Sequence, residues 1–442
     1  MGEQSVSTTT TRPPRDSDQP ADGPTGSGGT TKRSGALTAR VTLGRVYSTV
    51  PLEFLLIVSS ALLLTGFGVV MVISATMATA LGHGLSPYSD GLRQGLFALL
   101  GVSSMFVVSR LPVTFFRRIG WIALGVAVAV QLLVFTPLGI ERGGNRNWIE
   151  IATLSLQPSE LIKLALALWV AMILYRKRNL LTKWQHVYIP LVPVALLAIG
   201  TVLAGKDLGT SMVLVLIVLA CLFFSGVKLR IFAIPVILGV VGVVVLALTS
   251  SNRMKRIFSF MDENCDYLDD CYQPLHGIWG LAGGGIFGRG LGNSIEKYNW
   301  LPAAADDYIF SIVGEELGLI GCIVVLVLFA TFAVGAFRIV RNSEDPFVRI
   351  AAGGITVWIL GQALINIGVV LRVFPVLGVP LPFMSSGGSS LVAVLTGCGV
   401  LLAFCRTLPD PATVRAQNAV ARARPGRAAE TAPAGRPARL KK

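Results

Sequence analysis

The chain has 442 residues, of which 53% are hydrophobic and 14% are charged, and its formal net charge is +14. Soluble globular proteins carry about 25% charged residues, so this composition excludes an ordinary soluble enzyme and indicates a membrane protein. The basic residues flank apolar segments, as they do in the cytoplasmic loops of membrane proteins, so we expect no nucleic-acid partner.

The two ends of the chain have almost no large apolar side chains. Residues 1–48 are rich in Thr, Ser, Gly, Pro and Arg, and residues 407–442 in Ala, Pro and Arg. Such segments cannot bury enough apolar surface to offset the entropy lost on ordering. We therefore expect two disordered, basic, cytoplasmic tails around a transmembrane domain of residues 49–406. The C-terminal tail is expected to lie on anionic lipid or to bind a cytoplasmic partner.

Apolar runs long enough to cross a bilayer recur through the central domain. A membrane-spanning helix needs about 20 mostly apolar residues. Ten segments fit this description: 54–76, 94–109, 120–138, 158–175, 187–204, 208–225, 230–250, 308–337, 348–371 and 384–405. None alternates like a strand of a membrane barrel, so the predicted fold is all-α, a polytopic bundle of ten transmembrane helices.

The basic residues also predict the orientation of this bundle. Lys and Arg gather in the segments 32–45, 110–118, 176–178, 228–230 and 338–349, and at 406. With ten spans all of these fall on one side, which the positive-inside rule assigns to the cytoplasm. Both termini are then cytoplasmic. The long loop 251–306, between the seventh and eighth helices, lies outside, and loops of this length are commonly functional or disordered.

Charged residues inside apolar segments are the first functional candidates, because they are costly in a membrane. Glu160 and Lys163 lie three residues apart, so they share one face of the fourth predicted helix. They form either a local ion pair or part of a site. Asp207 begins the sixth predicted helix, where it either caps the helix or faces a polar cavity shared with Lys163.

Four acidic residues surround the start of the eighth predicted helix. Asp306 and Asp307 precede it, and helix capping explains only one of them. Two acids in tandem favour a raised pKa and a role for one of them as a base. Glu315 and Glu316 lie inside the apolar span, so we expect them to face the interior of the bundle.

A cluster of Ser and Gly begins the last predicted helix. Ser385, Ser386, Gly387 and Gly388 either direct hydroxyl and backbone N–H groups at an anion such as a pyrophosphate, or let the helices pack closely.

Two of the six cysteines, Cys265 and Cys271, fall in the long polar loop. In an oxidising exterior we expect them to close a small disulfide loop. The aspartates around them match no calcium-binding motif, so we expect a solvated loop there.

Seven stretches of the sequence together resemble one known family. They are GNRNWI at 144–149, QPSELIKL at 157–164, DLGT at 207–210, GGGIFGRGLGNS at 283–294, LPAAADDYIFSIVGEELGLIG at 301–321, INIGVV at 365–370 and GVPLPFMSSGGSS at 378–390. In this order they resemble the SEDS family (shape, elongation, division and sporulation proteins), which polymerises the peptidoglycan precursor lipid II. The INIGVV stretch and the long N-terminal tail favour the cell-division branch, in its actinobacterial form, over the elongation branch.

The resemblance implies roles for individual residues. The aspartate thought to be catalytic in the family matches Asp307, with Ala305 and Asp306 in place of the usual His and Thr. Asn147 stands where many members have Arg directly before Trp, and Arg146 is one residue earlier. Ser386 stands where a Tyr is common.

The implied reaction is an inverting glycosyl transfer outside the membrane, in which Asp307 is the general base and undecaprenyl pyrophosphate leaves. A divalent cation, Mg or Mn, is expected to assist the leaving group. The residues expected to bind substrate are Arg146, Glu160, Lys163, Asp207, Arg289, Lys297, Asp306, Glu315, Glu316, Asn366, Ser385, Ser386, Gly387 and Gly388. Of these, Arg146, Lys163, Arg289 and Lys297 are the candidate cations for the pyrophosphate.

The expected partners are lipid II, a class B penicillin-binding protein and other division proteins, and the expected location is the cytoplasmic membrane at the division septum. The main alternative is a transporter that flips lipid II across the membrane. Such a protein is expected to have polar residues at the midplane and a repeat relating its two halves. An elongation polymerase is the other alternative, and a scaffold that only recruits partners would leave the acidic and Gly-rich loops unexplained.

Overall fold

The computed structural model describes residues 51–142, 144–151, 154–248, 267 and 271–409. The tails predicted at 1–48 and 407–442 lie outside these residues, except for 407–409, so their predicted disorder stays a prediction. Residues 249–266 and 268–270, which include the first part of the predicted outer loop, also lie outside the described residues.

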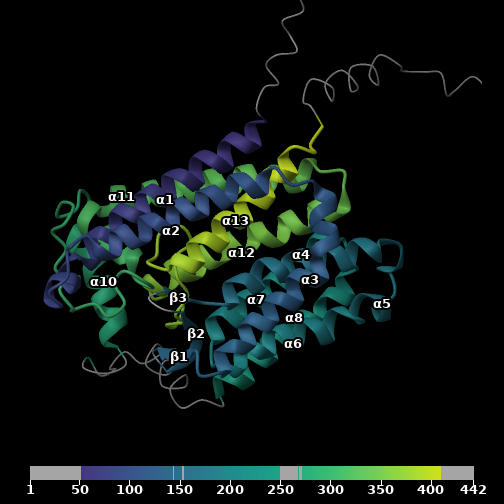
Figure 1. The fold of residues 1–442 in the computed structure, drawn as a ribbon, viewed down its shortest axis with the longest axis horizontal. Helices are drawn as coiled ribbons and strands as arrows, with labels where there is room; N and C mark the ends of the chain where they lie inside the picture. Colours follow the sequence, from purple (N-terminus) through teal and green to yellow (C-terminus); the bar gives the residue numbers. More distant parts are fainter. Residues whose placement is uncertain (1–50, 143, 152–153, 249–266, 268–270, 410–442) are drawn as a thin grey trace, which may run out of the picture. The chain divides into compact units, whose positions relative to one another are not determined.

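Long helices make up most of the described chain, and they run back and forth between two ends of a bundle (Figure 1). The helices are α1 (Leu52–Gly82), α2 (Ser89–Ser109), α3 (Val113–Leu132), α4 (Ser159–Arg176), α5 (Trp184–Tyr188), α6 (Leu191–Ala204), α7 (Leu208–Phe224), α8 (Leu229–Leu248), α10 (Tyr272–Gly284), α11 (Ile309–Asn342), α12 (Pro346–Val370) and α13 (Gly388–Cys405). Single 3₁₀ turns lie at Leu133–Phe135 and Arg178–Leu180. Each of the ten predicted spans corresponds to one of these helices.

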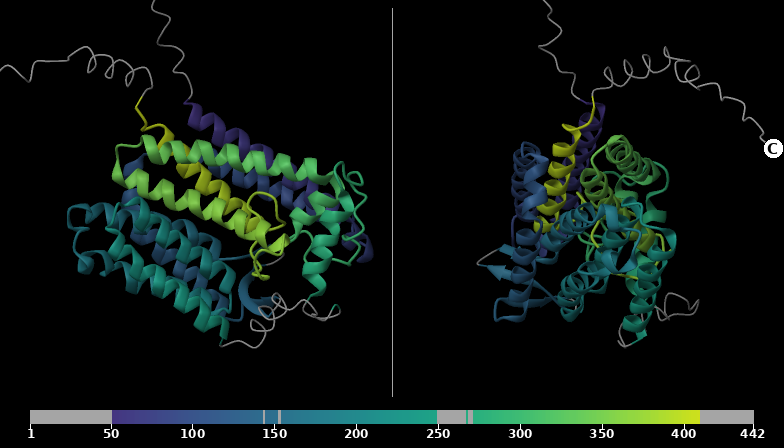
Figure 2. Two further views of the ribbon diagram at one scale, coloured as in Figure 1. Left: turned by 180° about the vertical axis from the view of Figure 1, so that it is seen from behind. Right: turned by 90° about the vertical axis from the view of Figure 1, so that its right-hand side faces the viewer.

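The helices form two neighbouring groups (Figure 2). One contains α1, α2, α11, α12 and α13, and the other contains α3, α4, α6, α7 and α8. Helix α12 joins them, because it packs against α11 and α13 on one side and against α4 and α7 on the other. Small residues permit this packing. A Cβ added at Gly353 would lie 2.1 Å from the Phe224 ring, and one at Gly354 would lie 2.5 Å from Cys221 Sγ. Close approach at small residues is the usual way in which helices pack inside membranes.

Seven of the described segments are long and apolar enough to cross a membrane, namely Leu52–Gly82, Ser89–Ser109, Val113–Phe135, Trp184–Ala204, Ile309–Asn342, Pro346–Val370 and Gly388–Cys405. Helix α7 is apolar but has only 17 residues. Helix α4 contains Glu160, Lys163 and Arg176. The chain is thus a polytopic, mostly helical membrane protein. The number of ten crossings and the cytoplasmic position of both termini stay predictions.

A small β-sheet was missed by the all-α prediction. Strands β1 (Gly139–Arg142), β2 (Asn145–Ile151) and β3 (Leu154–Leu156) form an antiparallel sheet in the order β1-β2-β3. In β2 the buried residues Asn147 and Ile149 alternate with the more exposed Trp148 and Glu150, which is the two-residue period of a strand. The third predicted helix, 120–138, accordingly ends earlier, at Leu132.

Helix α11 is broken near its start, although the sequence predicted one continuous span. Gly318 has φ +68° and ψ −164°, which is not helical. The segment that follows α10 bonds to the backbone around this break. Leu319 N donates to Gly285 O at 2.9 Å, and Arg289 N donates to Glu315 O at 2.9 Å. A break inside an apolar helix is tolerated where protein groups satisfy the freed backbone.

We expect Gly318→Ala to destabilise the protein by about 2 kcal/mol or more, because it combines a disfavoured backbone conformation with a steric clash. A Cβ at this position would lie 2.4 Å from both Gly288 N and Ile286 O. Thermal unfolding in lipid nanodiscs measures the effect. Gly125→Ala, in α3 with nothing within 4 Å of the added Cβ, is the matched control and should not lower the midpoint. Equal midpoints for both variants would contradict this account of the break.

Candidate active site

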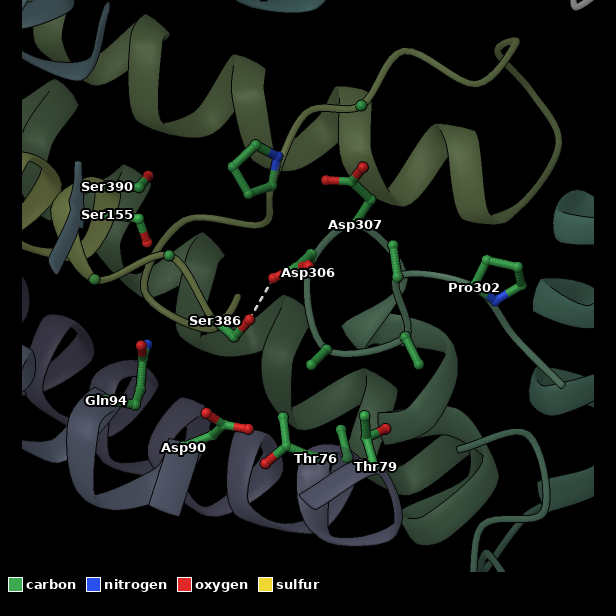
Figure 3. A pocket seen from close by; sticks show the side chains of 18 of the residues that line it. Thr76, Thr79, Asp90, Gln94, Ser155, Pro302, Asp306, Asp307, Ser386 and Ser390 are labelled. Atoms are coloured by element: carbon green, nitrogen blue, oxygen red, sulfur yellow. Dashed lines mark hydrogen bonds between the residues drawn. The ribbon is translucent and has the colours of Figure 1, made fainter. Parts of the chain in front are cut away.

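A large cavity opens at the end of the bundle where α1 ends and where α2, α4, α7, α11 and α13 begin. Its volume is about 880 Å³. Figure 3 shows polar side chains from α2, from the loop before α11 and from the loop before α13 around this space. The lining residues include Thr76, Thr79, Asp90, Arg93, Gln94, Asn145, Asn147, Trp148, Ser155, Gln157, Gln273, Lys297, Asn299, Asp306, Asp307, Gly378, Ser386, Gly387, Gly388 and Ser390. The paired aspartates Asp306 and Asp307 are far from the Ser-Gly cluster in the sequence, but both groups contribute residues to the lining of this cavity.

The loop before α11 presents the two aspartates. Ala303 has φ +53°, and its carbonyl accepts hydrogen bonds from the backbone N of Asp306, Asp307 and Tyr308. A left-handed conformation costs a non-glycine residue about 1–3 kcal/mol and persists only where the surroundings enforce it. This compact turn lies directly before Ile309, the first residue of α11, so the rigid helix fixes the position of both carboxylates.

The loop before α13 holds the Asp306 side of this turn. Ser386 Oγ donates a short hydrogen bond to Asp306 Oδ1, which Figure 3 shows as a dashed line. Ser386 N donates to Ala305 O at 3.0 Å, and Ser385 Oγ donates to Asp306 O at 2.5 Å. Gln94 of α2 in turn donates to Ser385 O at 3.0 Å. The Ser residues therefore bind the aspartate loop, which is a third role beside the two considered from sequence.

Asp307 is held by a different set of contacts. Asn366 Nδ2 donates to Asp307 O at 2.7 Å and to Val379 O at 2.8 Å, so α12 joins the aspartate loop to the 371–387 segment. The Asp307 side chain lines the cavity and is partly exposed. Gly378, with φ +66°, lies beside it: a Cβ there would be 3.7 Å from Asp307 Oδ2. Asn366, predicted to bind substrate, thus positions the backbone of Asp307.

Among the described lining residues the cations are Arg93 and Lys297. Arg93 is exposed, and its Nη2 donates to Ser155 Oγ at 3.2 Å. Lys297 is 2% exposed, and its Nζ bonds to Gly292 O at 2.5 Å and pairs with Glu316 Oε1 at 3.2 Å. Arg93 is therefore the cation available to an anionic ligand. Sequence reasoning missed it, although Asp90, Arg93 and Gln94 have the spacing of one helix face.

Three other predicted cations do not line the cavity. Arg146 Nη2 donates to Thr136 O at 2.9 Å, beside the sheet. Arg289 Nε donates to Gly283 O at 3.1 Å, and its Nη1 lies 3.7 Å from Glu315 Oε1. The third, Lys163, is discussed next. The residue beside Arg146, Asn147, lines the cavity instead.

Glu160 and Lys163 form the local ion pair that was one of the two sequence alternatives. Both are 1% exposed, and Lys163 Nζ lies 2.8 Å from Glu160 Oε1. Lys163 also donates to Gln362 Oε1 at 2.9 Å, and Gln362 Nε2 donates to Pro380 O at 2.9 Å. The charges thus support the loop at Pro380, which lines the cavity, from behind.

Asp207 caps α7, as the simpler sequence alternative expected. Its Oδ1 accepts from Thr210 N at 2.9 Å. Its Oδ2 accepts from Asn147 Nδ2 at 2.8 Å and from Gln157 Nε2 at 3.2 Å. One buried carboxylate therefore binds β2 and the start of α4 to α7. The other alternative, a polar cavity shared with Lys163, is not what the structure shows, because Asp207 and Lys163 bond to different partners.

Glu315 and Glu316 face the interior, as expected, but they do not line the cavity. Glu315 accepts from Ile295 N at 2.8 Å, from Glu296 N at 3.3 Å and from Ser294 Oγ. Glu316 accepts from Ser74 Oγ at 2.6 Å and pairs with Lys297. The geometry gives these acids a role in holding the 292–297 segment against α1 and α11.

Cys271 is buried and forms a disulfide. Its predicted partner, Cys265, lies outside the described residues, so the pairing stays a prediction. The four cysteines in helices, Cys221, Cys322, Cys398 and Cys405, are free and buried, as expected.

A buried His-Glu pair lies behind the cavity wall and was not foreseen from sequence. His276 Nδ1 lies 2.7 Å from Glu296 Oε2, and its ring stacks on Trp300. Burial raises the pKa of Glu296 above its ordinary value, and the hydrogen bond with His276 opposes this effect. The adjacent residue is Lys297, so the pair supports the same wall.

The carboxylates of the cavity fit a divalent cation brought in by a phosphorylated ligand. Among the described residues, no three His, Cys, Asp or Glu side chains converge on one point. Mg²⁺, however, is commonly bound by one or two carboxylates together with substrate phosphates. Asp306 could provide such a carboxylate, so the lining suits a site shared with a ligand better than a site made by protein alone.

A family model of cell cycle proteins, the FtsW/RodA/SpoVE family, matches residues 54–408. The probable peptidoglycan glycosyltransferase FtsW of Mycobacterium tuberculosis is 37% identical over 359 residues, which are 81% of this chain and 68% of the relative. Stage V sporulation protein E of Bacillus subtilis is 35% identical over 355 residues, covering 80% and 97%. The chain belongs to this family. The resemblance inferred from seven motifs is confirmed.

The solved structures agree with this assignment. The rod shape determining protein RodA of Thermus thermophilus is 25% identical, with a TM-score of 0.59 over 80% of this chain and 97% of that one. A chain from a structure described as the structural coordination of polymerization and crosslinking by a peptidoglycan synthase complex gives a TM-score of 0.64 at 24% identity, over 79% of this chain and 96% of that one. The latter likeness supports the fold alone.

The raised pKa of Glu296 predicts a pH dependence of stability. The folded state holds the Glu296 proton more tightly than the unfolded chain does. Its contribution is therefore fully present below the ordinary pKa of Glu, about 4.3, and is lost as pH rises through the raised pKa. Glu296→Gln keeps an acceptor for His276 and removes the titration. We expect the unfolding midpoint of this variant, relative to wild type, to rise with pH across that window.

Thermal unfolding in nanodiscs at a series of pH values between 4 and 7 measures this difference. Glu150→Gln, at an exposed position in β2, is the matched control and should show a constant difference from wild type. A constant difference for Glu296→Gln as well would show that burial of this carboxyl does not control the stability.

Proposed function

We propose that this protein is a peptidoglycan glycosyltransferase that polymerises lipid II into glycan strands for septal cell-wall synthesis during division. The observation that carries the proposal is that one cavity is lined both by a partly exposed carboxylate in the loop directly before α11, Asp307, and by a solvent-exposed guanidinium, Arg93. The names of the relatives support it, because the FtsW proteins at 37% and 38% identity are described as probable peptidoglycan glycosyltransferases.

The proposed reaction joins two lipid-linked disaccharides. The 4-hydroxyl of the GlcNAc of one lipid II molecule attacks the anomeric carbon of the MurNAc of another. A new C–O bond forms, the bond to undecaprenyl pyrophosphate breaks, and the configuration inverts. Asp307 accepts the proton of the attacking hydroxyl as general base. Arg93 binds the pyrophosphate, where preorganised positive charge stabilises the leaving group.

Asp307 suits the role of base better than the other two acids of the cavity. The Asp306 carboxylate accepts a short hydrogen bond from Ser386 and so joins the loop before α11 to the loop before α13. Asp90 lies on α2, on the other side of the space from Asp307 (Figure 3). The Asp307 backbone is fixed by Asn366, so its carboxylate has a defined position.

A divalent cation, Mg or Mn, completes the proposed site. When bound, it would neutralise charge on the pyrophosphate. Asp306 is the residue that would hold it, together with the substrate phosphates.

The proposed orientation places the cavity on the outer face of the cytoplasmic membrane. The basic connections 110–118, 176–178 and 228–230 lie at the other end of the bundle, which fits a cytoplasmic position by the positive-inside rule. A class B penicillin-binding protein is the proposed partner, as the resemblance to the SEDS family implies. The division role rests on relatives named FtsW, and an elongation role is the alternative.

Asp307→Asn is expected to lower lipid II polymerisation by about 10²–10⁴-fold, because the amide cannot accept the proton. The measurement is glycan chain formation from purified lipid II, with and without a cognate class B penicillin-binding protein. Asp306→Asn is the matched neighbour. It can still accept the hydrogen bond from Ser386, and we expect it to keep more activity.

Loss of polymerisation in Asp306→Asn but not in Asp307→Asn would show that Asp307 is not the base. If the wild type makes no chains under any condition and instead moves lipid II across liposome membranes, the protein is a transporter and the proposal fails.

Arg93→Gln is expected to reduce kcat/KM by about 10–100-fold, which corresponds to one hydrogen-bonded charge pair of about 1.5–3 kcal/mol. Arg93→Lys should recover part of the loss. The control is Arg289→Gln, which removes a cation that the sequence suggested for this role but that does not line the cavity. A larger loss in Arg289→Gln than in Arg93→Gln would show that the leaving group binds elsewhere.

A further inference from the structure

The turn between α10 and α11 displays two large apolar side chains. Phe287 is 80% exposed, more than any other large hydrophobic residue among those the structure describes, and Ile286 is 60% exposed. Neither side chain belongs to the cavity. Single exposed apolar residues are common on protein surfaces, so the surroundings of this turn decide its meaning.

The turn is held rigidly against the break in α11. Leu319 N donates to Gly285 O at 2.9 Å, and Ile320 N donates to Ile286 O at 3.3 Å. Gly288 has φ +80°, and a Cβ there would lie 2.2 Å from Glu316 O. The backbone is therefore fixed by close contacts on both sides of Ile286 and Phe287.

The turn continues an exposed apolar face of α11. Beyond the break, Leu319, Ile320, Ile323, Val324 and Val327 are between 46% and 56% exposed. They lie in the most apolar of the candidate membrane spans, with a mean hydropathy of 2.8. In a membrane-spanning protein an apolar face of this kind is suited to contact with lipid acyl chains. Because the Ile286 carbonyl accepts a hydrogen bond from Ile320 at the start of that face, the turn lies where the apolar face of α11 begins.

We propose that Ile286 and Phe287 insert among the lipid acyl chains of the leaflet on the cavity side. Burial of a Phe or Ile side chain contributes about 1.5–3 kcal/mol, and the rigid turn loses little further conformational freedom on insertion. The glycine break of α11 makes this possible, because it lets a second segment bond to the helix backbone at the edge of the bilayer.

The anchored turn is continuous with the wall of the cavity. Arg289 N donates to Glu315 O, and the Glu315 carboxylate accepts from the backbone of Ile295 and Glu296, beside Lys297. The lipid contact therefore fixes the height of the 292–297 segment relative to the membrane. It depends on the protein being in a bilayer and not on the proposed glycosyl transfer.

The test places a polarity-sensitive fluorophore at Phe287→Cys, in the full chain in nanodiscs. The described cysteines do not compete, because Cys271 forms a disulfide and the other four are buried. Asn293→Cys, at an exposed polar position six residues along, is the matched control. At residue 287 only, we expect blue-shifted emission, because an acyl-chain environment excludes water. We also expect at least about twofold quenching by brominated lipids at this residue, because the probe would contact their acyl chains.

Equal quenching of both probes by aqueous iodide, with no effect of brominated lipids, would overturn the proposal. The proposal would also fail if the probe at residue 287 were quenched by iodide in the protein alone and protected from iodide only after a penicillin-binding protein is added. The turn would then be a protein interface. Lipid II polymerisation by the same labelled protein is a separate readout, so failure of the lipid contact is distinguishable from failure of the enzymatic proposal.

Discussion

The structure depends on how the non-helical backbone around the cavity is satisfied. In a membrane protein each carbonyl and N–H group away from water needs a partner, and helices satisfy their own. The cavity, however, is formed by loops at 301–308 and 371–387 and by a small sheet. Buried polar side chains provide the missing partners: Asn366 for two carbonyls, Gln362 for Pro380 O, and Glu315 for two backbone N–H groups. Most of the polar motifs of this sequence serve that purpose.

The same constraint gives several of the buried candidate charges a structural role. Breaking a buried ion pair by removing one partner costs about 3–5 kcal/mol, because the other charge is left uncompensated. Glu160 with Lys163, and Glu316 with Lys297, are such pairs. Each also bonds to a segment that lines the cavity or lies next to it. Loss of activity on mutating any of these four residues is therefore weak proof of substrate contact, and stability must be measured beside it.

The sequence predicted a helix for each span and singled out Asp307, which lines the cavity, but it was insufficient for what surrounds them. Apolar length alone located one helix for every predicted span, because a bilayer imposes that length. Asp307 was found because the motif around it is long. The sheet was missed because its strands are short and lie beside long apolar runs. The break at Gly318 was missed because the sequence does not distinguish a glycine that breaks a helix from a glycine that lets two helices pack closely. Arg93 was missed because its partner, Ser155, is 62 residues away.

Helix α12 links these observations to the chemistry. Gln362 and Asn366 are four residues apart, so they project from one face of the helix and hold Pro380 O, Val379 O and Asp307 O in a row. The same helix joins the two helix groups of the bundle. A general base works only where its position relative to the substrate is fixed to a fraction of an ångström, and sites on rigid elements achieve this better than sites on loops. The aspartate lies in a loop, but its backbone is hydrogen-bonded to a central helix, which restricts the movement of the loop.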